Sequence, residues 1–277
     1  MNPLVETDWL FKNINNVRIF DATWHLPNLN RNAEKEFEAK HIQGSVFFDI
    51  DKHSNKKSNL PHMMPDKKKW EKVISDFGIK NTDHVIIYDN SDLYSSCRLW
   101  FSFIYFGHDT NLVSVLNGGL KKWLIEKKEV TTKIKKFNKS VYSAEEKEYL
   151  ILKKQNIDEN IKIKKFKLVD ARSEERFLGK VKEPRKGLKS GSIPGSLNLP
   201  YKDCINSAEN TFKNKKDLKI IFDKLDLKDK VAFTCGSGVT ACVLGLVNSL
   251  INDTNPLIYD GSWSEYGILR YEDSNKN

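Results

Sequence analysis

The chain contains few cysteines for its 277 residues, and their spacing gives no sign of a metal site. They are Cys97, Cys204, Cys235 and Cys242. No two of them form a Cys-x-x-Cys pair, and no His-x₃₋₅-His pair accompanies them, which argues against bound zinc. The spacing does not support a disulfide framework either, so we expect reduced thiols, no metal and no cofactor.

Long apolar stretches are also missing. No run approaches the ~20 apolar residues that are needed to cross a bilayer. The first residues, Met-Asn-Pro-Leu-Val-Glu-Thr-Asp-Trp, have neither the basic and apolar segments of a secretory signal nor the Arg-rich character of a transit peptide. We therefore expect a cytoplasmic protein that does not contact membranes.

Acidic residues are in the minority. The chain has 46 Lys and Arg against 37 Asp and Glu, which gives a net charge of +9. Much of the excess lies between Lys127 and Lys167, where Lys is interleaved with Glu, Asn and Ile. We interpret this stretch as a solvated linker and helix face, not as a nucleic-acid surface. A positive surface would still help to attract small anionic substrates.

Four segments of the first half recur in the second half, each displaced by about 150 residues, which indicates an internal repeat. The paired segments are 17–22 with 166–171, 41–49 with 192–200, 84–89 with 231–235, and 116–123 with 259–266. Each half alternates short β-branched runs with helical stretches. This pattern predicts two tandem α/β domains, each a mostly parallel sheet flanked by helices. We expect the domains at 1–135 and 149–277, joined by a linker at 136–148.

Cys235 is the residue with the clearest chemical setting. It ends a strand-like apolar run, glycines follow at positions 236 and 238, and helical character resumes near Thr240. A thiol on a tight loop before a helix faces loop N–H groups and the positive end of the helix dipole, and both favour the thiolate. We therefore expect Cys235 to be a nucleophile. We interpret Cys242, on the following helix, as an ordinary buried thiol.

The two halves differ at the position of this cysteine, because the first half has Asp89 there. Only the C-terminal domain can use a thiol at that position. The N-terminal domain is therefore expected to shape the cleft. The chain's tryptophans at positions 24, 70, 100, 123 and 263 are expected to serve core and interdomain packing.

Several motifs together resemble the two-domain rhodanese-type sulfurtransferases. They are Asp-Ala-Arg (170–172), Gly-Ser-Ile-Pro-Gly-Ser (191–196) and above all Cys-Gly-Ser-Gly-Val-Thr (235–240). The last motif resembles the 3-mercaptopyruvate sulfurtransferase branch, and the resemblance extends from about Leu4 to Gly267. It implies that sulfane sulfur passes from 3-mercaptopyruvate through a persulfide on Cys235 to a thiol or cyanide acceptor, with release of pyruvate.

The same resemblance implies roles for residues outside the cysteine loop. Ser237 would form a proton relay with His62 and Asp51, and Asp49 is a competing choice for the acid. Arg176 and Arg185 would hold the donor, because a guanidinium binds a carboxylate through two parallel hydrogen bonds. The loop residues expected to bind substrate are Gly236, Gly238, Val239 and Thr240, and Thr240 is also a candidate helix cap.

The expected partners are a small-molecule sulfur donor and a thiol acceptor, with thioredoxin among the candidate acceptors. We expect a monomer or weak dimer that binds no nucleic acid.

Three other functions remain open. A thiosulfate sulfurtransferase would share the fold, but the thiosulfate branch carries basic residues directly after the cysteine, where this chain has Gly236 and Ser237. A Cys-dependent phosphatase needs an arginine at the sixth position past the cysteine, and Ala241 stands there. A catalytically silent binding module would lack the cysteine, which is present.

Overall fold

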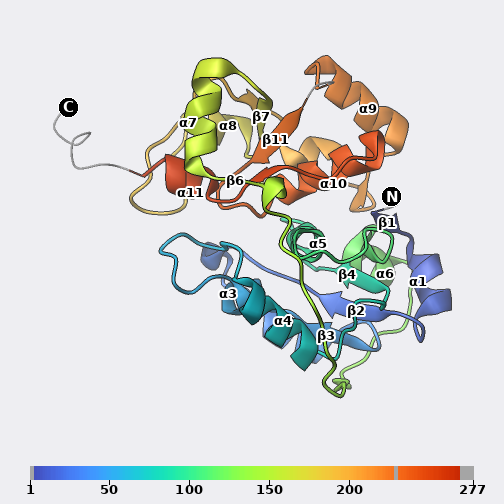
Figure 1. Ribbon diagram of the computed structural model, residues 1–277. Coiled ribbons are helices and arrows are strands. Elements are labelled where there is room, and N and C mark those ends of the chain that lie inside the picture. Colours follow the sequence, from blue (N-terminus) through green and yellow to red (C-terminus); the bar gives the residue numbers. More distant parts are fainter. Residues whose placement is uncertain (1–2, 228–229, 269–277) are drawn as a thin grey trace.

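The computed structural model describes residues 3–227 and 230–268, and each half of the chain builds a five-stranded sheet (Figure 1). The N-terminal sheet has the spatial order β1-β5-β4-β2-β3, and the C-terminal sheet has the corresponding order β6-β12-β11-β7-β8. All neighbouring strands in both sheets are parallel. The predicted tandem α/β architecture is confirmed.

The strands are short and largely buried. In the N-terminal sheet they are β1 (Leu4–Val5), β2 (Arg18–Asp21), β3 (Ser45–Phe47), β4 (Val85–Tyr88) and β5 (Val113–Leu116). In the C-terminal sheet they are β6 (Ile151–Leu152), β7 (Lys167–Asp170), β8 (Leu197–Asn198), β11 (Val231–Thr234) and β12 (Ile258–Tyr259). A separate antiparallel hairpin consists of β9 (Ile205–Asn206) and β10 (Thr211–Phe212).

Helices flank both sheets. Those of the N-terminal half are α1 (Thr7–Asn13), α2 (Ala33–Ala39), α3 (Ile50–His53), α4 (Lys67–Asp76), α5 (Ser96–Tyr105) and α6 (Gly119–Ile125), with a 3₁₀ turn η1 (Pro27–Leu29). Those of the C-terminal half are α7 (Lys154–Ile163), α8 (Glu174–Phe177), α9 (Lys215–Lys224), α10 (Ala241–Asn252) and α11 (Ser262–Tyr266), with 3₁₀ turns η2 (Glu148–Leu150) and η3 (Tyr201–Cys204).

Local sequence explains where several helices begin. Asp66 accepts a hydrogen bond from the N–H of Lys69 at the start of α4, and Asn214 does the same for Asp217 at the start of α9. Such side chains satisfy N–H groups that have no partner within the helix. Thr240 occupies the cap position of α10, but its side chain makes no capping hydrogen bond, so its predicted role as a helix cap is wrong.

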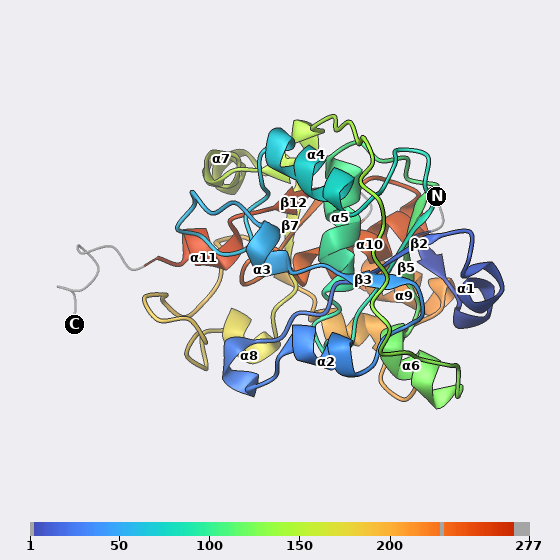
Figure 2. The same cartoon turned by 90° about the horizontal axis from the view of Figure 1, so that it is seen from below.

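The two domains meet along helices α5 and α10, which lie against each other between the two sheets (Figures 1 and 2). Every residue of α5 is buried, and so is α10 from Ala241 to Ser249. A helix that is buried on all sides needs mostly apolar residues, and both sequences provide them, with Arg98 as the charged exception in α5. The hydrophobic core therefore continues from one domain into the other.

These two helices also fix the position of the chemistry. Helix α5 follows β4 and the loop that begins with Asp89, and α10 follows β11 and the loop that begins with Cys235. Because α5 and α10 pack together, the two equivalent loops belong to one interdomain region. The tryptophans at positions 24, 70, 100, 123 and 263 are all buried, as expected.

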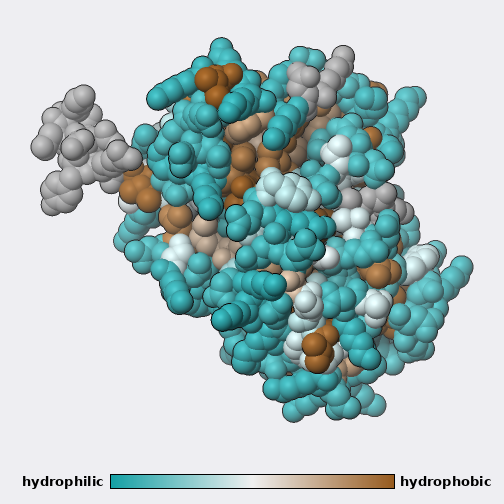
Figure 3. Space-filling view, in the orientation of Figure 1, coloured by the Kyte–Doolittle hydropathy of each residue, from teal (hydrophilic) through white to brown (hydrophobic). Residues whose placement is uncertain are grey.

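The Lys-rich segment between α6 and η2 contains no helix or regular strand. It crosses the N-terminal domain, where Thr131 forms a bridge with His41 and where Tyr142 and Ala144 are buried (Figure 1). Hydrophilic residues cover most of the face shown in Figure 3. Within the described ranges, no helix is both long and apolar enough to cross a membrane. The domain limits at 135 and 149 stay predictions.

Candidate active site

Cys235 lies at the carboxyl end of β11, and its side chain is almost fully buried. Two carbonyls at the start of its loop accept hydrogen bonds from helix α11. The N–H of Trp263 donates to the carbonyl of Cys235 at 2.9 Å, and the N–H of Ser264 donates to the carbonyl of Gly236 at 2.8 Å. The N–H groups of residues 236–240 donate to no acceptor within the described part of the chain. The carbonyls of Cys235 and Gly236 therefore face helix α11, and the N–H groups of the loop stay available to an anion.

Gly238 has a structural reason to be glycine. Its φ is +77°, a backbone conformation that side chains disfavour. A Cβ atom there would also lie 3.0 Å from the carbonyl oxygen of Asp260 and 3.1 Å from Arg98 Nη1. Gly238 therefore shapes the loop, but it does not line the pocket that Cys235 faces.

His62, from the N-terminal domain, lies between Ser237 and Asp51. Its Nδ1 is 3.0 Å from Ser237 Oγ, and its Nε2 is 3.1 Å from Asp51 Oδ1. The hydrogen bond from His62 is the main cause that holds the pKa of Asp51 below its usual value. Trp24 Nε1 adds a second hydrogen bond to Asp51, at 2.7 Å. Asp49 instead caps α3 through the N–H of Lys52, so the carboxylate at His62 is Asp51.

The two predicted arginines reach the cysteine loop from the segment after β7. Arg176 is part of the short helix α8, and Arg185 lies in the loop that follows. A Cβ atom on Gly236 would be 3.1 Å from Arg176 Nη2 and 3.9 Å from Arg185 Nη1. The absence of a side chain at Gly236 therefore makes room for both guanidinium groups beside Cys235.

The two guanidinium groups have different surroundings. Arg176 is held by Glu183, through hydrogen bonds of 2.6 and 3.2 Å, and Glu183 also binds the buried Arg172 at 2.8 Å. Arg185 has no hydrogen bond or ion pair with any residue that the structure describes. Burial lowers the pKa of Arg185, while the nearby Cys235 favours its charged form. Arg185 is thus a partly buried cation with free donors.

A pocket of about 220 Å³ lies over the thiol of Cys235 and is lined by residues of both domains. The C-terminal domain contributes Cys235 and the predicted binding residues Gly236, Val239, Thr240, Arg176 and Arg185. The opposite wall comes from the N-terminal domain and consists mainly of Trp24, Leu26, Pro27 and Leu93. The pocket therefore combines an apolar wall, two guanidinium groups and a thiol, which suits a small organic anion.

Sequence reasoning missed the wall residues and Glu183. A signal for the wall existed, because Trp24 follows the carboxyl end of β2, and parallel sheets bind ligands at the carboxyl ends of their strands. Glu183 is seven residues after Arg176, and no local pattern indicates that they pair.

Comparison with known proteins agrees with this architecture. The model of the rhodanese-like domain matches residues 6–126 and again residues 153–268. The chain belongs to the rhodanese family. It is 38% identical over 254 residues to 3-mercaptopyruvate sulfurtransferase of Mus musculus, covering 90% of this chain and 84% of the relative. It is 37% identical to thiosulfate sulfurtransferase of Mus musculus, covering 95% and 91%.

A solved structure also has this fold. The crystal structure of SseA from Escherichia coli, described as a 3-mercaptopyruvate sulfotransferase with the rhodanese fold, superposes with a TM-score of 0.85 at 31% identity. The match covers 96% of this chain and 100% of that one.

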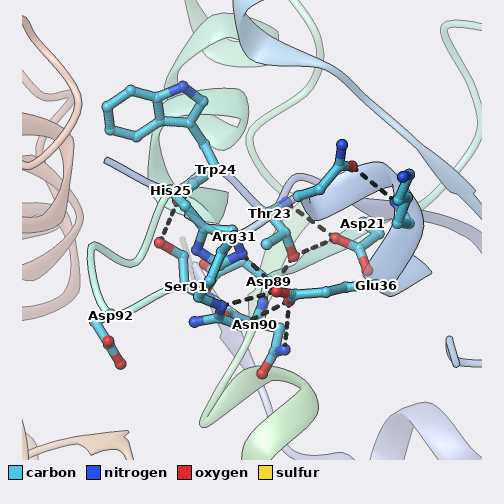
Figure 4. Close-up of polar contacts among 12 residues, drawn as sticks. Asp21, Thr23, Trp24, His25, Arg31, Glu36, Asp89, Asn90, Ser91 and Asp92 are labelled. Carbon is cyan, nitrogen blue, oxygen red and sulfur yellow. Dashed lines mark hydrogen bonds and ion pairs between the residues drawn. The ribbon is translucent and has the colours of Figure 1, made fainter. Parts of the chain in front are cut away.

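In the first rhodanese-like domain, the loop equivalent to the Cys235 loop is closed by its own hydrogen bonds. Asp89, labelled in Figure 4, stands at the cysteine position. Its carboxylate accepts hydrogen bonds from the N–H groups of Ser91 and Ser96, at 2.9 and 2.8 Å. Asn90 N–H donates to Thr23 Oγ1 at 2.8 Å. Two of the amides that remain available in the Cys235 loop, those of residues 236 and 237, thus correspond to amides that are occupied here, at Asn90 and Ser91. Burial raises the pKa of Asp89.

This closed loop still serves the pocket. Ser91 Oγ donates to the carbonyl of Trp24 (Figure 4). Leu93 itself lines the pocket. The loop also contacts the C-terminal domain, because Tyr201 Oη donates to the carbonyl of Asp92 at 2.9 Å. The first domain has no nucleophile at this position, and its loop supports the pocket wall instead.

None of the other three cysteines lines the pocket. All four cysteines are free and buried. Burial raises the pKa of Cys242 and of Cys204 to about 12, so their thiols stay protonated near neutral pH. Burial raises the pKa of Cys97 as well. This fits the interpretation of Cys242 as an ordinary buried thiol.

Proposed function

We propose that this chain is a 3-mercaptopyruvate sulfurtransferase that carries sulfur as a persulfide on Cys235. One observation carries the proposal: the thiol lies in a pocket whose own loop is uncharged, beside two guanidinium groups. The sequence identity to a relative named for 3-mercaptopyruvate nearly equals that to a relative named for thiosulfate. Sequence identity therefore does not distinguish between these two donors. The geometry of the site favours mercaptopyruvate.

The donor's carboxylate matches the free donors of Arg185, and Arg176 is preoriented beside it by Glu183. Charge-assisted hydrogen bonds to a guanidinium are among the stronger polar contacts in proteins. Thiosulfate is a compact dianion with no carbon skeleton, and it gains little from an apolar wall such as that of Trp24 and Leu93. A three-carbon keto acid can contact both the wall and the guanidinium groups.

The proposed reaction begins with attack of the Cys235 thiolate on the sulfur of 3-mercaptopyruvate. The S–S bond forms as the C3–S bond of the donor breaks, and the electron pair of that bond passes to carbon, which gives the enolate of pyruvate. One proton then converts the enolate to pyruvate. The free N–H groups of residues 236–240 stabilise the thiolate before attack and the persulfide after it.

We assign the proton supply to Ser237, His62 and Asp51. When its ring carries a proton on each nitrogen, His62 donates from Nε2 to Asp51 and from Nδ1 to the hydroxyl oxygen of Ser237. The hydroxyl of Ser237 then gives its proton to the enolate carbon while the Nδ1–H of His62 replaces it, and solvent reprotonates the imidazole before the next turnover. A positioned acid of this kind typically accelerates a proton transfer by roughly 10²–10⁴-fold.

In the second half of the reaction a thiol or cyanide removes the outer sulfur and restores the Cys235 thiolate. We propose a cellular thiol as the natural acceptor, thioredoxin among them, and a cytoplasmic location in which thiols stay reduced. We also propose that the chain acts as a monomer or weak dimer. Assays with dithiothreitol, thioredoxin and cyanide, followed by cell fractionation, test these points.

Steady-state kinetics with both donors test the function. We expect kcat/KM for 3-mercaptopyruvate to exceed that for thiosulfate, and Cys235→Ser to abolish both. Mass spectrometry of the protein after incubation with donor alone should show a gain of about 32 Da, one sulfur atom, on Cys235. A preference for thiosulfate would make the chain a rhodanese in the narrow sense. The lack of any adduct would make it a silent binding module.

A further inference from the structure

An ion pair between the two domains lies directly behind the proposed relay. Arg98 is on α5 of the N-terminal domain, and Asp260 follows β12 of the C-terminal domain. Arg98 Nη2 is 2.6 Å from Asp260 Oδ1, and each side chain is only 3% exposed. Burying two charges costs free energy, so a pair in this position calls for an explanation beyond stability.

The guanidinium of Arg98 reaches both loops that hold the relay. Its Nη2 donates to the carbonyl of His62 at 2.5 Å, and its Nη1 donates to the carbonyl of Gly238 at 3.3 Å. Gly238 is the residue after Ser237, the partner of His62. One rigid, planar group therefore connects the backbone of the histidine to the backbone of the cysteine loop.

Asp260 completes this connection with its second oxygen. Its Oδ2 accepts from the N–H of Met64 at 3.0 Å, two residues beyond His62. His62 itself has a φ of +60°, which is uncommon for a residue other than glycine. Contacts on both sides of this residue offset the cost of that conformation and determine where its ring lies.

The internal repeat shows that interdomain packing alone does not require the arginine. In the alignment of the two halves, Asn117 corresponds to Asp260, and it too accepts a backbone N–H from the other domain, that of Phe212 at 2.9 Å. Leu244 on α10 corresponds to Arg98. The contact of Asn117 with Phe212 thus forms without an arginine at the position equivalent to Arg98. Of the two equivalent contacts, only the one next to the Cys235 loop includes an arginine.

We propose that Arg98 and Asp260 are positioning residues for the sulfur-transfer reaction, which hold His62 and Ser237 in hydrogen-bonding register across the domain boundary. This inference rests on the proposed function. The pair acts through geometry and not through its charge, because the two side chains neutralise each other and neither lines the pocket.

The electrostatic surroundings agree with a permanent ion pair. Burial lowers the pKa of Arg98, but attraction to Asp260 outweighs it, and the net pKa lies above its usual value. The thiol of Cys242, 4.0 Å from Arg98 Nη1, stays protonated at neutral pH because burial raises its pKa to about 12. Arg98 therefore has a single anionic partner in Asp260 among the residues that the structure describes.

The experiment compares Arg98→Lys and Asp260→Ala with Asn117→Ala, which removes the equivalent contact away from the site. We expect the first two variants to lower kcat for 3-mercaptopyruvate by about 100-fold, the loss typical of a misplacement near 1 Å, with KM changed only a few-fold. Asn117→Ala should keep a kcat near wild type at a similar loss of thermal stability. An equal loss of kcat in Asn117→Ala would overturn the proposal.

A double-mutant cycle tests the route of the effect. If Arg98 acts through His62, Arg98→Lys should cost little further activity in a His62→Ala background, because the contact that it positions is already gone. A full 100-fold additional loss would show that Arg98 acts on something else and would contradict the proposal.

A third measurement separates this inference from the proposed function. Absence of turnover by the wild-type protein with any sulfur donor would refute the function itself. The ring ¹⁵N signals of His62 report its hydrogen bonds without any substrate. They should shift in Arg98→Lys and stay in place in Asn117→Ala, and unchanged signals in Arg98→Lys would refute the positioning role.

Discussion

His62 and Ser237 are 175 residues apart in the chain, yet their side chains lie within 3.0 Å. The histidine belongs to the first domain, and the serine belongs to the loop of Cys235, the proposed nucleophile, in the second. Neither domain alone contains a complete relay. Catalysis by this chain is therefore expected to depend on the packing of α5 against α10, which brings the two loops together.

The relay gives the first prediction. His62→Ala should lower kcat with 3-mercaptopyruvate by roughly 10²–10⁴-fold, because the enolate loses its positioned proton source. Asp51→Asn should have a smaller effect in the same direction. Alkylation of Cys235 by iodoacetamide should remain stoichiometric in both variants. Asp49→Asn is the matched control, since Asp49 only caps α3, and its kcat should match that of wild type. An undiminished kcat in His62→Ala would refute the relay.

The space beside Gly236 gives a second prediction. Gly236→Arg should lower kcat/KM for 3-mercaptopyruvate and raise the ratio of thiosulfate to mercaptopyruvate activity. A side chain at this position meets Arg176 Nη2 at 3.1 Å and displaces it, while the added cation suits a dianionic donor. Gly236→Ala adds the Cβ atom without the charge and separates the two effects. If the donor ratio of Gly236→Arg equals that of wild type, the proposed origin of donor choice is wrong.

The unequal surroundings of the two arginines give a third prediction. Arg185→Lys should raise KM for 3-mercaptopyruvate by about 10- to 100-fold, since a charge-assisted hydrogen bond is worth about 1.5–3 kcal/mol. Glu183→Gln should raise KM less, because it weakens the contacts of Glu183 with Arg176 and Arg172 but leaves both guanidinium groups in place. Arg18→Lys, in a partly exposed ion pair with Asp83, serves as the control and should leave KM unchanged. Equal KM values for wild type and Arg185→Lys would remove Arg185 from the site.

A fourth prediction concerns stability and pH. The repeated segment reads Asp21-Ala22-Thr23 in the first domain and Asp170-Ala171-Arg172 in the second, so Asp170 has a cationic partner that Asp21 lacks. Burial raises the pKa of Asp21 from 3.8 to about 7, although Thr23 donates two hydrogen bonds to it (Figure 4). Its folded-state pKa thus exceeds the unfolded one. The contribution of protonated Asp21 to the free energy of unfolding is fully present below about pH 4. It is lost as the pH rises through 7, because the unfolded chain releases this proton more easily than the folded one.

Asp21→Asn should therefore remove part of this pH dependence. At 1.36 kcal/mol per pKa unit, the free energy of unfolding of wild type should fall by up to about 4 kcal/mol between pH 4 and pH 8 because of this group. Urea unfolding at the two pH values measures the difference. The exposed Asp109→Asn should behave as wild type. A pH dependence that is identical in Asp21→Asn would show that Asp21 does not titrate in this range.

The architecture and the local setting of Cys235 could be read from the sequence. Repeated segments are local patterns, and so are the strand, the glycines and the helix around Cys235. The motif residues also led to Asp51, His62, Arg176 and Arg185, all of which lie at or beside the pocket. Local rules were less reliable for finer roles: Thr240 does not cap α10 with its side chain, and Gly238 shapes the loop without lining the pocket.

By itself, then, the sequence determined which elements form, that they form twice, and which of the two copies holds a thiol, because these properties depend on neighbours in the chain. Tertiary structure alone decided that Asp51 and not Asp49 meets His62, that Glu183 restrains Arg176 and that Arg98 joins Asp260. Such pairs depend on how two sheets and two buried helices pack, and contacts between distant segments leave no periodic trace in a single sequence.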